Sequence, residues 1–327
     1  MGDINRIYEP HQIMLDMTIH GVVKEMDGCI SLEHTCSGVS FVTEATHMVI
    51  WLSGEAMSEM TCAWIEIECA LIGKKLKQKI KIDNKDIKSS FCFPEGHKTI
   101  SILKVTEKKY GTACIRKVLL NDHCKGRSMQ ENARALFIGD SITCGNSVEP
   151  FSLFHRFSTK YENGKKAYPY IVSEKQGFNY TIWSYSGMGV WRNHIDFTGD
   201  TALKMFSREC LDDRNYEYIF INVGTNDARF IMGEETRSLF LSEYEKLLDY
   251  FISSYKTKGL YLVVGPMTMK CNDAIKELAQ KKQGELGCVI RVIECRAFLF
   301  DGLGNGKHPT YKAQKRMAKI IVSQIGL

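Results

Sequence analysis

Ser141 is the residue of this sequence best placed to do chemistry. It ends the segment Ala135-Leu-Phe-Ile-Gly-Asp-Ser, in which a short apolar run leads directly into a polar turn. A serine hydroxyl becomes a useful nucleophile only when a base removes its proton and hydrogen-bond donors await the oxyanion. The Gly-x-Ser-x-Gly elbow of other serine hydrolases is absent, because Thr143 replaces its second glycine. Taken alone, Gly-Asp-Ser also fits an ordinary turn after a strand.

Two later segments contain groups that can contact a ligand. The segment Ser184–Asn193 contains Gly187 and Gly189, and the backbone N–H of a glycine can approach a ligand closely. The segment Asn222-Val-Gly-Thr-Asn-Asp places the side-chain amide of Asn226 beside the same site. A plain turn is the alternative interpretation of both glycines.

His308 stands close to the C-terminus, where it precedes a proline in the glycine-rich segment Asp301–Thr310. A histidine imidazole can act as the base of a serine nucleophile, whereas a lone histidine is usually structural.

The second half of the chain alternates short apolar runs with segments of helical period. This pattern predicts a parallel sheet covered by helices on both faces. Ligands of such sheets bind at the carboxyl ends of the strands, where Ser141 and the later segments stand. The predicted strands are Ala135–Gly139, Tyr180–Ser184, Tyr218–Val223, Gly259–Val264 and Val289–Glu294. The predicted helices include Thr236–Tyr255, Asn272–Gln283 and Thr310–Ile325.

The first half shows alternation of period two and no convincing amphipathic helix. It predicts an all-β sandwich with jelly-roll-like or immunoglobulin-like topology. The lysines of residues 75–82 are typical of a solvated edge strand, with polyanion binding as the alternative. Residues 121–132 are polar and aperiodic and form the predicted linker, which gives domains 1–128 and 129–327. The predicted strands are Gly38–Thr43, His47–Leu52, Ala63–Ile72, Thr99–Thr106 and Thr112–Leu120.

The order Gly-Asp-Ser, Gly-x-Gly, Gly-Thr-Asn-Asp and His-Pro resembles the SGNH (GDSL-type) hydrolase superfamily. The resemblance covers nearly the whole second half. The segment Phe137–Gly145, the region around Tyr161, and Asp301-Gly-Leu-Gly before His308 are similar to carbohydrate esterase family 2. Members of that family join a jelly-roll-like β-sandwich to a flavodoxin-like, three-layer α/β/α SGNH domain with a parallel sheet. They remove O-acetyl groups from plant-type polysaccharides.

The resemblance implies a role for each candidate residue. Ser141 would be the nucleophile and His308 its base. The oxyanion would be held by the N–H of Ser141, the N–H of Gly187 or Gly189, and the amide of Asn226.

The chain departs from the superfamily at the carboxylate that usually orients the histidine. That aspartate stands three residues before the histidine, or two before in some family members, where this chain has Asn305 and Gly306. We expect a Ser-His dyad in which a backbone carbonyl of residues 305–307 or the Asn305 side chain orients the imidazole. Asp301 is the alternative partner.

Other features limit the range of functions. Asp140 and Asp227 are expected to hold loop backbone rather than act as bases. The mechanism requires no metal or cofactor, and the sequence has no Walker-type loop and no Gly-x-Gly-x-x-Gly after a strand. Its twelve cysteines include no Cys-x-x-Cys, so no structural zinc site is expected.

The composition is that of an ordinary globular protein. The 327 residues are 44% hydrophobic, which is enough for two domains with their own cores. The 43 basic and 38 acidic side chains are interspersed, which does not favour a nucleic-acid partner. No apolar run approaches a membrane span, and the N-terminus has no secretory-signal pattern. With scattered cysteines, this predicts a cytoplasmic location.

The sequence thus predicts a serine esterase that removes O-acetyl groups from xylan-type or mannan-type oligosaccharides or polysaccharides. Trp183 and Trp191 are candidate sugar platforms, with buried packing as the alternative. The alternative functions are a lipase or thioesterase of the wider superfamily and a carbohydrate-binding protein without turnover. The sequence leaves the oligomeric state open.

Overall fold

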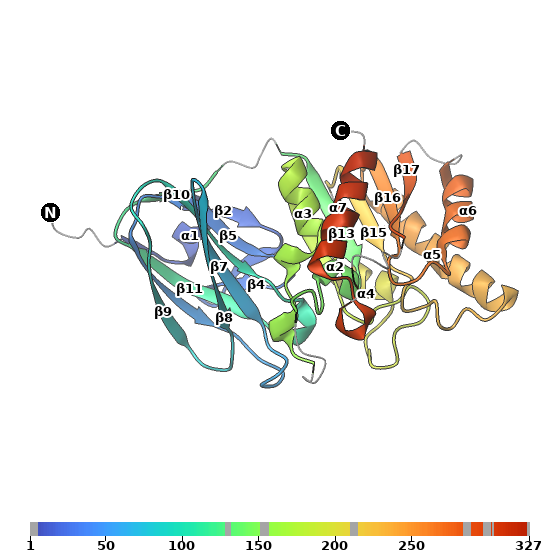
Figure 1. Cartoon of the computed structure of the whole chain (residues 1–327), viewed down its shortest axis with the longest axis horizontal. Helices are drawn as coiled ribbons and strands as arrows, with labels where there is room; N and C mark the ends of the chain where they lie inside the picture. Colours follow the sequence, from blue (N-terminus) through green and yellow to red (C-terminus); the bar gives the residue numbers. More distant parts are fainter. Residues whose placement is uncertain are drawn as a thin grey trace. The chain divides into compact units, whose positions relative to one another are not determined.

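The chain forms two compact units in a computed structural model that describes residues 6–127, 132–150, 157–209, 215–283, 289–296, 302 and 304–325 (Figure 1). Unit 1 comprises Met1–Glu131 and Arg156–Glu162, and unit 2 comprises Asn132–His155 and Asn163–Leu327. The predicted domain boundary between residues 128 and 129 lies outside the described residues. The grouping of residues 156–162 with unit 1 has no counterpart in the sequence pattern.

Unit 1 contains two six-stranded sheets whose paired strands run antiparallel. The first has the order β3 (Val23–Met26), β4 (Cys29–Leu32), β11 (Ala113–Leu120), β6 (His47–Ser53), β9 (Ile87–Cys92), and β1 (Arg6–Tyr8) pairs with β11. The second has the order β12 (Cys124–Lys125), β5 (Gly38–Thr43), β10 (Lys98–Lys104), β7 (Trp64–Leu71), β8 (Lys74–Lys81), and β2 (Thr18–His20) pairs with β5.

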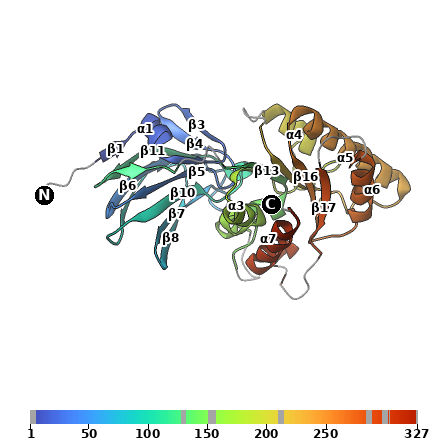
Figure 2. The ribbon, with the colours of Figure 1, turned by 90° about the horizontal axis from the view of Figure 1, so that it is seen from above.

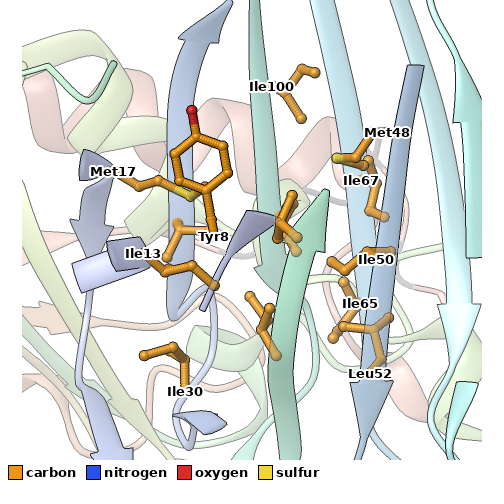
Figure 3. Packing of buried hydrophobic residues seen from close by; sticks show 14 of the residues in the cluster. Tyr8, Ile13, Met17, Ile30, Met48, Ile50, Leu52, Ile65, Ile67 and Ile100 are labelled. Carbon is orange, nitrogen blue, oxygen red and sulfur yellow. The ribbon is translucent and has the colours of Figure 1, made fainter. Parts of the chain in front are cut away.

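Both sheets contribute to one buried apolar cluster. Alternate residues of a strand point to the same face, so Met48, Ile50 and Leu52 of β6 all enter this cluster. Ile65 and Ile67 of β7, in the other sheet, lie close to them (Figure 3). Burial of each such side chain contributes about 1.5 to 3 kcal/mol.

Two expectations for the first half were wrong. A helix, α1 (Pro10–Asp16), is present where none was expected. Pro10 occupies its first turn and the side chain of Gln12 accepts a hydrogen bond from the N–H of Glu9, while seven residues are too few to display helical periodicity. The predicted linker is partly a strand, because β12 pairs with β5.

The lysine-rich strand β8 lies at the end of its sheet and pairs with β7. Lys75 lies 3.2 Å from Glu68, and Lys77 lies 2.7 Å from Glu68 and 3.5 Å from Glu66. Neutralisation of these lysines by carboxylates of the neighbouring strand favours the solvated-edge interpretation.

Unit 2 contains a five-stranded parallel sheet, as predicted. Its order is β14 (Asn179–Ser184), β13 (Arg134–Gly139), β15 (Tyr218–Asn222), β16 (Gly259–Val264) and β17 (Val289–Glu294). Numbered along the chain this is 2-1-3-4-5, the doubly wound order of flavodoxin-like folds. Phe137, Phe220 and Tyr261 stack across β13, β15 and β16 with ring centroids 4.6 and 4.9 Å apart, which fixes the register of the strand before Ser141.

Helices cover both faces of this sheet (Figure 2). On one face lie α3 (Tyr168–Gln176) and α7 (Tyr311–Ile325), and on the other α4 (Ala202–Glu209), α5 (Glu234–Ser254) and α6 (Asn272–Gln283). The three predicted helices are confirmed as α5, α6 and α7. Within the described ranges, no helix combines the length and apolar character that a membrane span requires. None of the ten cysteines of those ranges forms a disulfide.

Candidate active site

Ser141 is the first residue of the one-turn helix α2 (Ser141–Cys144), directly after β13. A carboxylate oxygen of Asp140 accepts the N–H of Ile142 at 3.0 Å and caps this turn. Gly139 is required before it, because a Cβ there would overlap the hydroxyl of Thr143. Ser141 is 7% exposed, and its hydroxyl has no hydrogen-bond partner among the described residues. The structure therefore leaves this hydroxyl available and does not join it to His308 by a hydrogen bond.

The two candidate glycines differ in the state of their N–H groups. The N–H of Gly189 donates to Oδ1 of Asn193 at 2.8 Å. The carbonyl of Gly187 accepts the N–H of His194 at 2.8 Å, whereas the Gly187 N–H has no acceptor within the described part of the chain. Gly187 is thus the glycine whose N–H is available to a ligand.

Asp227 organises the loop after β14. Its carboxylate accepts the backbone N–H groups of Val190, Trp191 and Arg192 at 2.9, 2.7 and 2.7 Å. Burial raises the pKa of Asp227 above its ordinary value, and these three hydrogen bonds oppose that effect. The prediction that Asp227 holds loop backbone is confirmed, and Asp140 has the same role at Ile142.

Asn226 joins the loops that follow three strands. Its side-chain nitrogen donates to the carbonyl of Met188 at 2.8 Å and to a carboxylate oxygen of Asp140 at 3.2 Å. Asp140 directly precedes Ser141, so the amide lies beside the α2 turn. The structure brings Asn226 together with this turn, as the motif order predicted.

Ser186 and two residues near Ser141 form a second link between the loops. Asn146 donates to the hydroxyl of Ser186 at 3.2 Å, and the thiol of Cys144 lies 3.4 Å from the same oxygen. Sequence reasoning did not identify these side chains. The signal that the sequence offered was that Ser186 lies in the segment Ser184–Asn193 and Cys144 in the segment Phe137–Gly145.

Gln314 is a further positioning residue that the sequence did not reveal. Its amide donates to the carbonyl of Ile142 at 2.8 Å and accepts the N–H of Tyr168 at 2.9 Å. Gln314 is 0% exposed and belongs to α7, whose start follows His308 closely. The only sign of this contact in the sequence was that Gln314 stands among the apolar positions of the predicted helix Thr310–Ile325.

His308 lies in a compact loop before α7. The N–H of Gly304 donates to its carbonyl at 2.7 Å, and a Cβ built at Gly304 would lie 3.4 Å from the carbonyl oxygen of Ser147. The histidine loop therefore packs near the end of the Ser141 turn. Gly306 has φ +61°, and a Cβ there would approach Nδ1 of His308 to 3.1 Å, so a side chain at 306 would crowd the imidazole. Asp301 and the side chain of Asn305 lie outside the described residues.

The two tryptophans proposed as sugar platforms have different environments. Trp183 is 0% exposed and its Nε1 donates to Glu209 at 2.7 Å, so the platform interpretation of Trp183 is wrong and the packing alternative is correct. Its side chain is buried because β14 lies between helices and packs an aromatic cluster that includes Phe206. Trp191 is half-buried.

Comparison with known proteins supports the resemblance. No protein-family model matches the chain. It is 26% identical over 204 residues to the cellulase/esterase CelE of Acetivibrio thermocellus, and the match covers 58% of this chain and 25% of that protein. The chain thus spans about a quarter of the length of this relative.

Solved structures match over nearly the whole chain. A family two carbohydrate esterase from Clostridium thermocellum in complex with cellohexaose superposes with a TM-score of 0.82 at 18% identity, covering 94% of this chain and 98% of that one. The acetyl xylan esterase Est2A from the rumen bacterium Butyrivibrio proteoclasticus superposes with a TM-score of 0.85 at 14% identity, covering 98% of both chains. Unit 2 has the fold of SGNH hydrolases, and the resemblance to carbohydrate esterase family 2 and the SGNH hydrolases is confirmed at the level of the fold.

Proposed function

We propose that this chain is a serine esterase that removes O-acetyl groups from carbohydrate through an acetyl-enzyme on Ser141. The observation that carries the proposal is that the Ser141 hydroxyl and the Gly187 N–H have no partner among the described residues, while the Asn226 amide contacts Asp140 directly before Ser141. The similar proteins are named a cellulase/esterase, a family two carbohydrate esterase and an acetyl xylan esterase, which supports the same reaction.

The reaction follows from this arrangement. The Ser141 oxygen attacks the acetyl carbonyl while His308 takes its proton, and the carbonyl oxygen becomes an oxyanion. Collapse of the tetrahedral intermediate releases the sugar alkoxide, which His308 protonates. Water then attacks the acetyl-enzyme, His308 accepts the water proton, and acetic acid leaves as the proton returns to Ser141.

The oxyanion is assigned to the N–H groups of Ser141 and Gly187 and to the amide of Asn226. Gly189 is not assigned this role, because its N–H is engaged by Asn193. The Asn226 nitrogen now contacts Asp140 at 3.2 Å and Met188 at 2.8 Å, so the longer of these bonds would yield to the oxyanion. One such donor contributes about 3 to 4 kcal/mol in the transition state.

The imidazole is oriented by its own loop in this proposal. A Cβ built at Gly306 would lie 3.1 Å from Nδ1 of His308, so Nδ1 lies close to this backbone, and we assign the proton exchange with Ser141 to Nε2. A Ser-His dyad with a backbone acceptor therefore remains our assignment, with Asp301 as the alternative partner. Loss of turnover in a folded Asp301→Asn variant would contradict the dyad.

Two further parts of the proposal concern substrate and architecture. Trp191 remains the candidate sugar platform, since its ring is half-buried rather than enclosed. We also propose that the two sheets of unit 1 form a jelly-roll-like sandwich. Their shared apolar cluster supports this arrangement.

The test compares esters with a short and a long acyl chain. Wild type, Ser141→Ala and the exposed control Ser253→Ala are assayed with 4-nitrophenyl acetate and octanoate, and then with acetylated xylo-oligosaccharides. We expect acetate-selective turnover that falls about a thousandfold or more in Ser141→Ala only. Preference for octanoate would indicate a lipase, and no turnover by folded wild type would indicate a carbohydrate-binding protein.

A further inference from the structure

Two arginines and two aromatic side chains form a group beside the candidate site, here named the arginine–aromatic rim. It consists of Trp191 and Arg192 after β14 and Arg229 and Phe230 after β15. The guanidinium of Arg192 lies 4.9 Å from the ring centroid of Trp191 and 5.6 Å from that of Phe230. The guanidinium of Arg229 lies 5.3 Å from the Phe230 ring. Cation–π contacts thus hold two positive charges over adjoining rings.

Within the part of the chain that the structure describes, these two positive charges have no carboxylate counter-ion. Both arginines are exposed, and within the described ranges neither guanidinium makes a hydrogen bond or an ion pair. The neighbouring carboxylates are engaged elsewhere: Asp227 accepts backbone N–H groups, and Asp196 lies 3.3 Å from His194. The rim is therefore a locally cationic surface in which guanidinium groups keep their donors free.

Hydrogen bonds through Asp227 connect the rim to the loops that carry the proposed oxyanion donors. Asp227 holds the N–H of Trp191 through its carboxylate and the N–H of Phe230 through its backbone carbonyl, at 2.7 and 2.8 Å. The preceding residue, Asn226, contacts Asp140 beside the nucleophile. A sugar chain with its acetyl ester at Ser141 would therefore have its neighbouring units near the rim.

We propose that the arginine–aromatic rim binds the carboxylate of an acidic sugar unit, so that the preferred substrates are acetylated oligosaccharides carrying a uronic acid. A guanidinium presents donors in a planar fork that matches a carboxylate, and the aromatic faces pack on the C–H face of a sugar ring. This inference rests on the proposed function and names its substrate class.

The first experiment measures substrate preference in the wild type. Acetic acid release is followed with two acetylated xylo-oligosaccharides of equal length, one neutral and one with a glucuronic acid branch. We expect kcat/KM to be about fivefold to tenfold higher for the acidic substrate at low salt. The preference should shrink as added salt screens the charge.

Variants that remove one positive charge then test whether the rim causes the preference for the acidic substrate. Arg192→Gln and Arg229→Gln are compared with Arg208→Gln, an exposed arginine on α4 that pairs with Asp200. The ratio of kcat/KM for acidic over neutral substrate is expected to fall towards 1 in the first two variants and to stay at the wild-type value in Arg208→Gln. A ratio cancels any general loss of activity or of folded protein.

A binding measurement separates this inference from the proposed function. Calorimetry with wild type and non-acetylated oligosaccharides, acidic and neutral, requires no turnover. Tighter binding of the acidic chain that is lost in Arg229→Gln supports the rim even if no ester is hydrolysed. Equal binding and an acidic-to-neutral ratio of 1 in the active wild type would overturn the rim while leaving the esterase intact.

Discussion

Gln314 offers a stringent test of how the nucleophile turn is held. Its side chain forms two buried hydrogen bonds, from Nε2 to the carbonyl of Ile142 at 2.8 Å and to Oε1 from the N–H of Tyr168 at 2.9 Å. Gln314→Leu retains most of the volume but leaves both backbone groups without a partner. Each costs about 1 to 3 kcal/mol, so the free energy of unfolding is expected to fall by about 2 to 6 kcal/mol.

Gln314→Leu is also expected to lower the rate of ester hydrolysis. Ile142 directly follows Ser141, so release of its carbonyl displaces the nucleophile, and a shift of about 1 Å costs on the order of a hundredfold in rate. We expect kcat for 4-nitrophenyl acetate to fall more than KM rises. Gln314→Glu adds a pH signature, because only the protonated carboxyl can donate to Ile142, and its activity relative to the wild type should therefore recover as the pH falls.

The measurements are urea unfolding and steady-state kinetics, with Gln280→Leu as an exposed control on α6. A Gln314→Leu variant whose unfolding free energy and kcat both match those of the control would refute the reasoning. So would a Gln314→Glu variant with the pH profile of the wild type.

Three other predictions test neighbouring groups. Asn226→Ala should lower kcat by about a hundredfold to a thousandfold with little change in KM, measured with 4-nitrophenyl acetate. Asp227→Asn turns an acceptor oxygen into an NH₂ group facing backbone donors, so urea unfolding should show a loss of about 1 to 3 kcal/mol. Burial lowers the pKa of Lys104 to about 7, so the unfolded state binds its proton more tightly, and the contribution of Lys104 to stability should rise between pH 7 and the ordinary pKa of 10.5, by at most about 1.4 kcal/mol per pH unit. Lys104→Met should remove that slope in urea unfolding, and exposed Lys85→Met should keep it.

The sequence was sufficient to predict those parts of the structure that depend on residues close together along the chain. The five strands of unit 2 could be predicted within a residue because each is a short apolar run ended by turn residues. Ser141 and Asn226 could be proposed as site residues because each lies in the turn that follows such a strand. The donor choice between Gly187 and Gly189 could not be made, since it depends on the side chain of Asn193 and on how the loop folds.

Contacts between residues far apart in the sequence could not be predicted from sequence patterns. Gln314 and Ile142 are 172 residues apart, and a glutamine on a helix has no periodic signature of such a bond. The return of residues 156–162 to unit 1 depends on Thr159, whose hydroxyl donates to the carbonyl of Cys62 at 2.8 Å across 97 residues. The burial of Trp183 follows from the helices that cover β14, and a strand sequence does not reveal which of its aromatic residues they cover.

Asp227 connects the two proposals. Its carboxylate fixes the backbone from Val190 to Arg192, and the residue before it is Asn226, the proposed oxyanion donor. A substrate carboxylate held at Arg192 would therefore act on the same rigid segment that shapes the oxyanion site. Because that segment is held by three hydrogen bonds to one buried carboxylate, binding of an acidic sugar should improve positioning of the ester and raise kcat as well as lower KM.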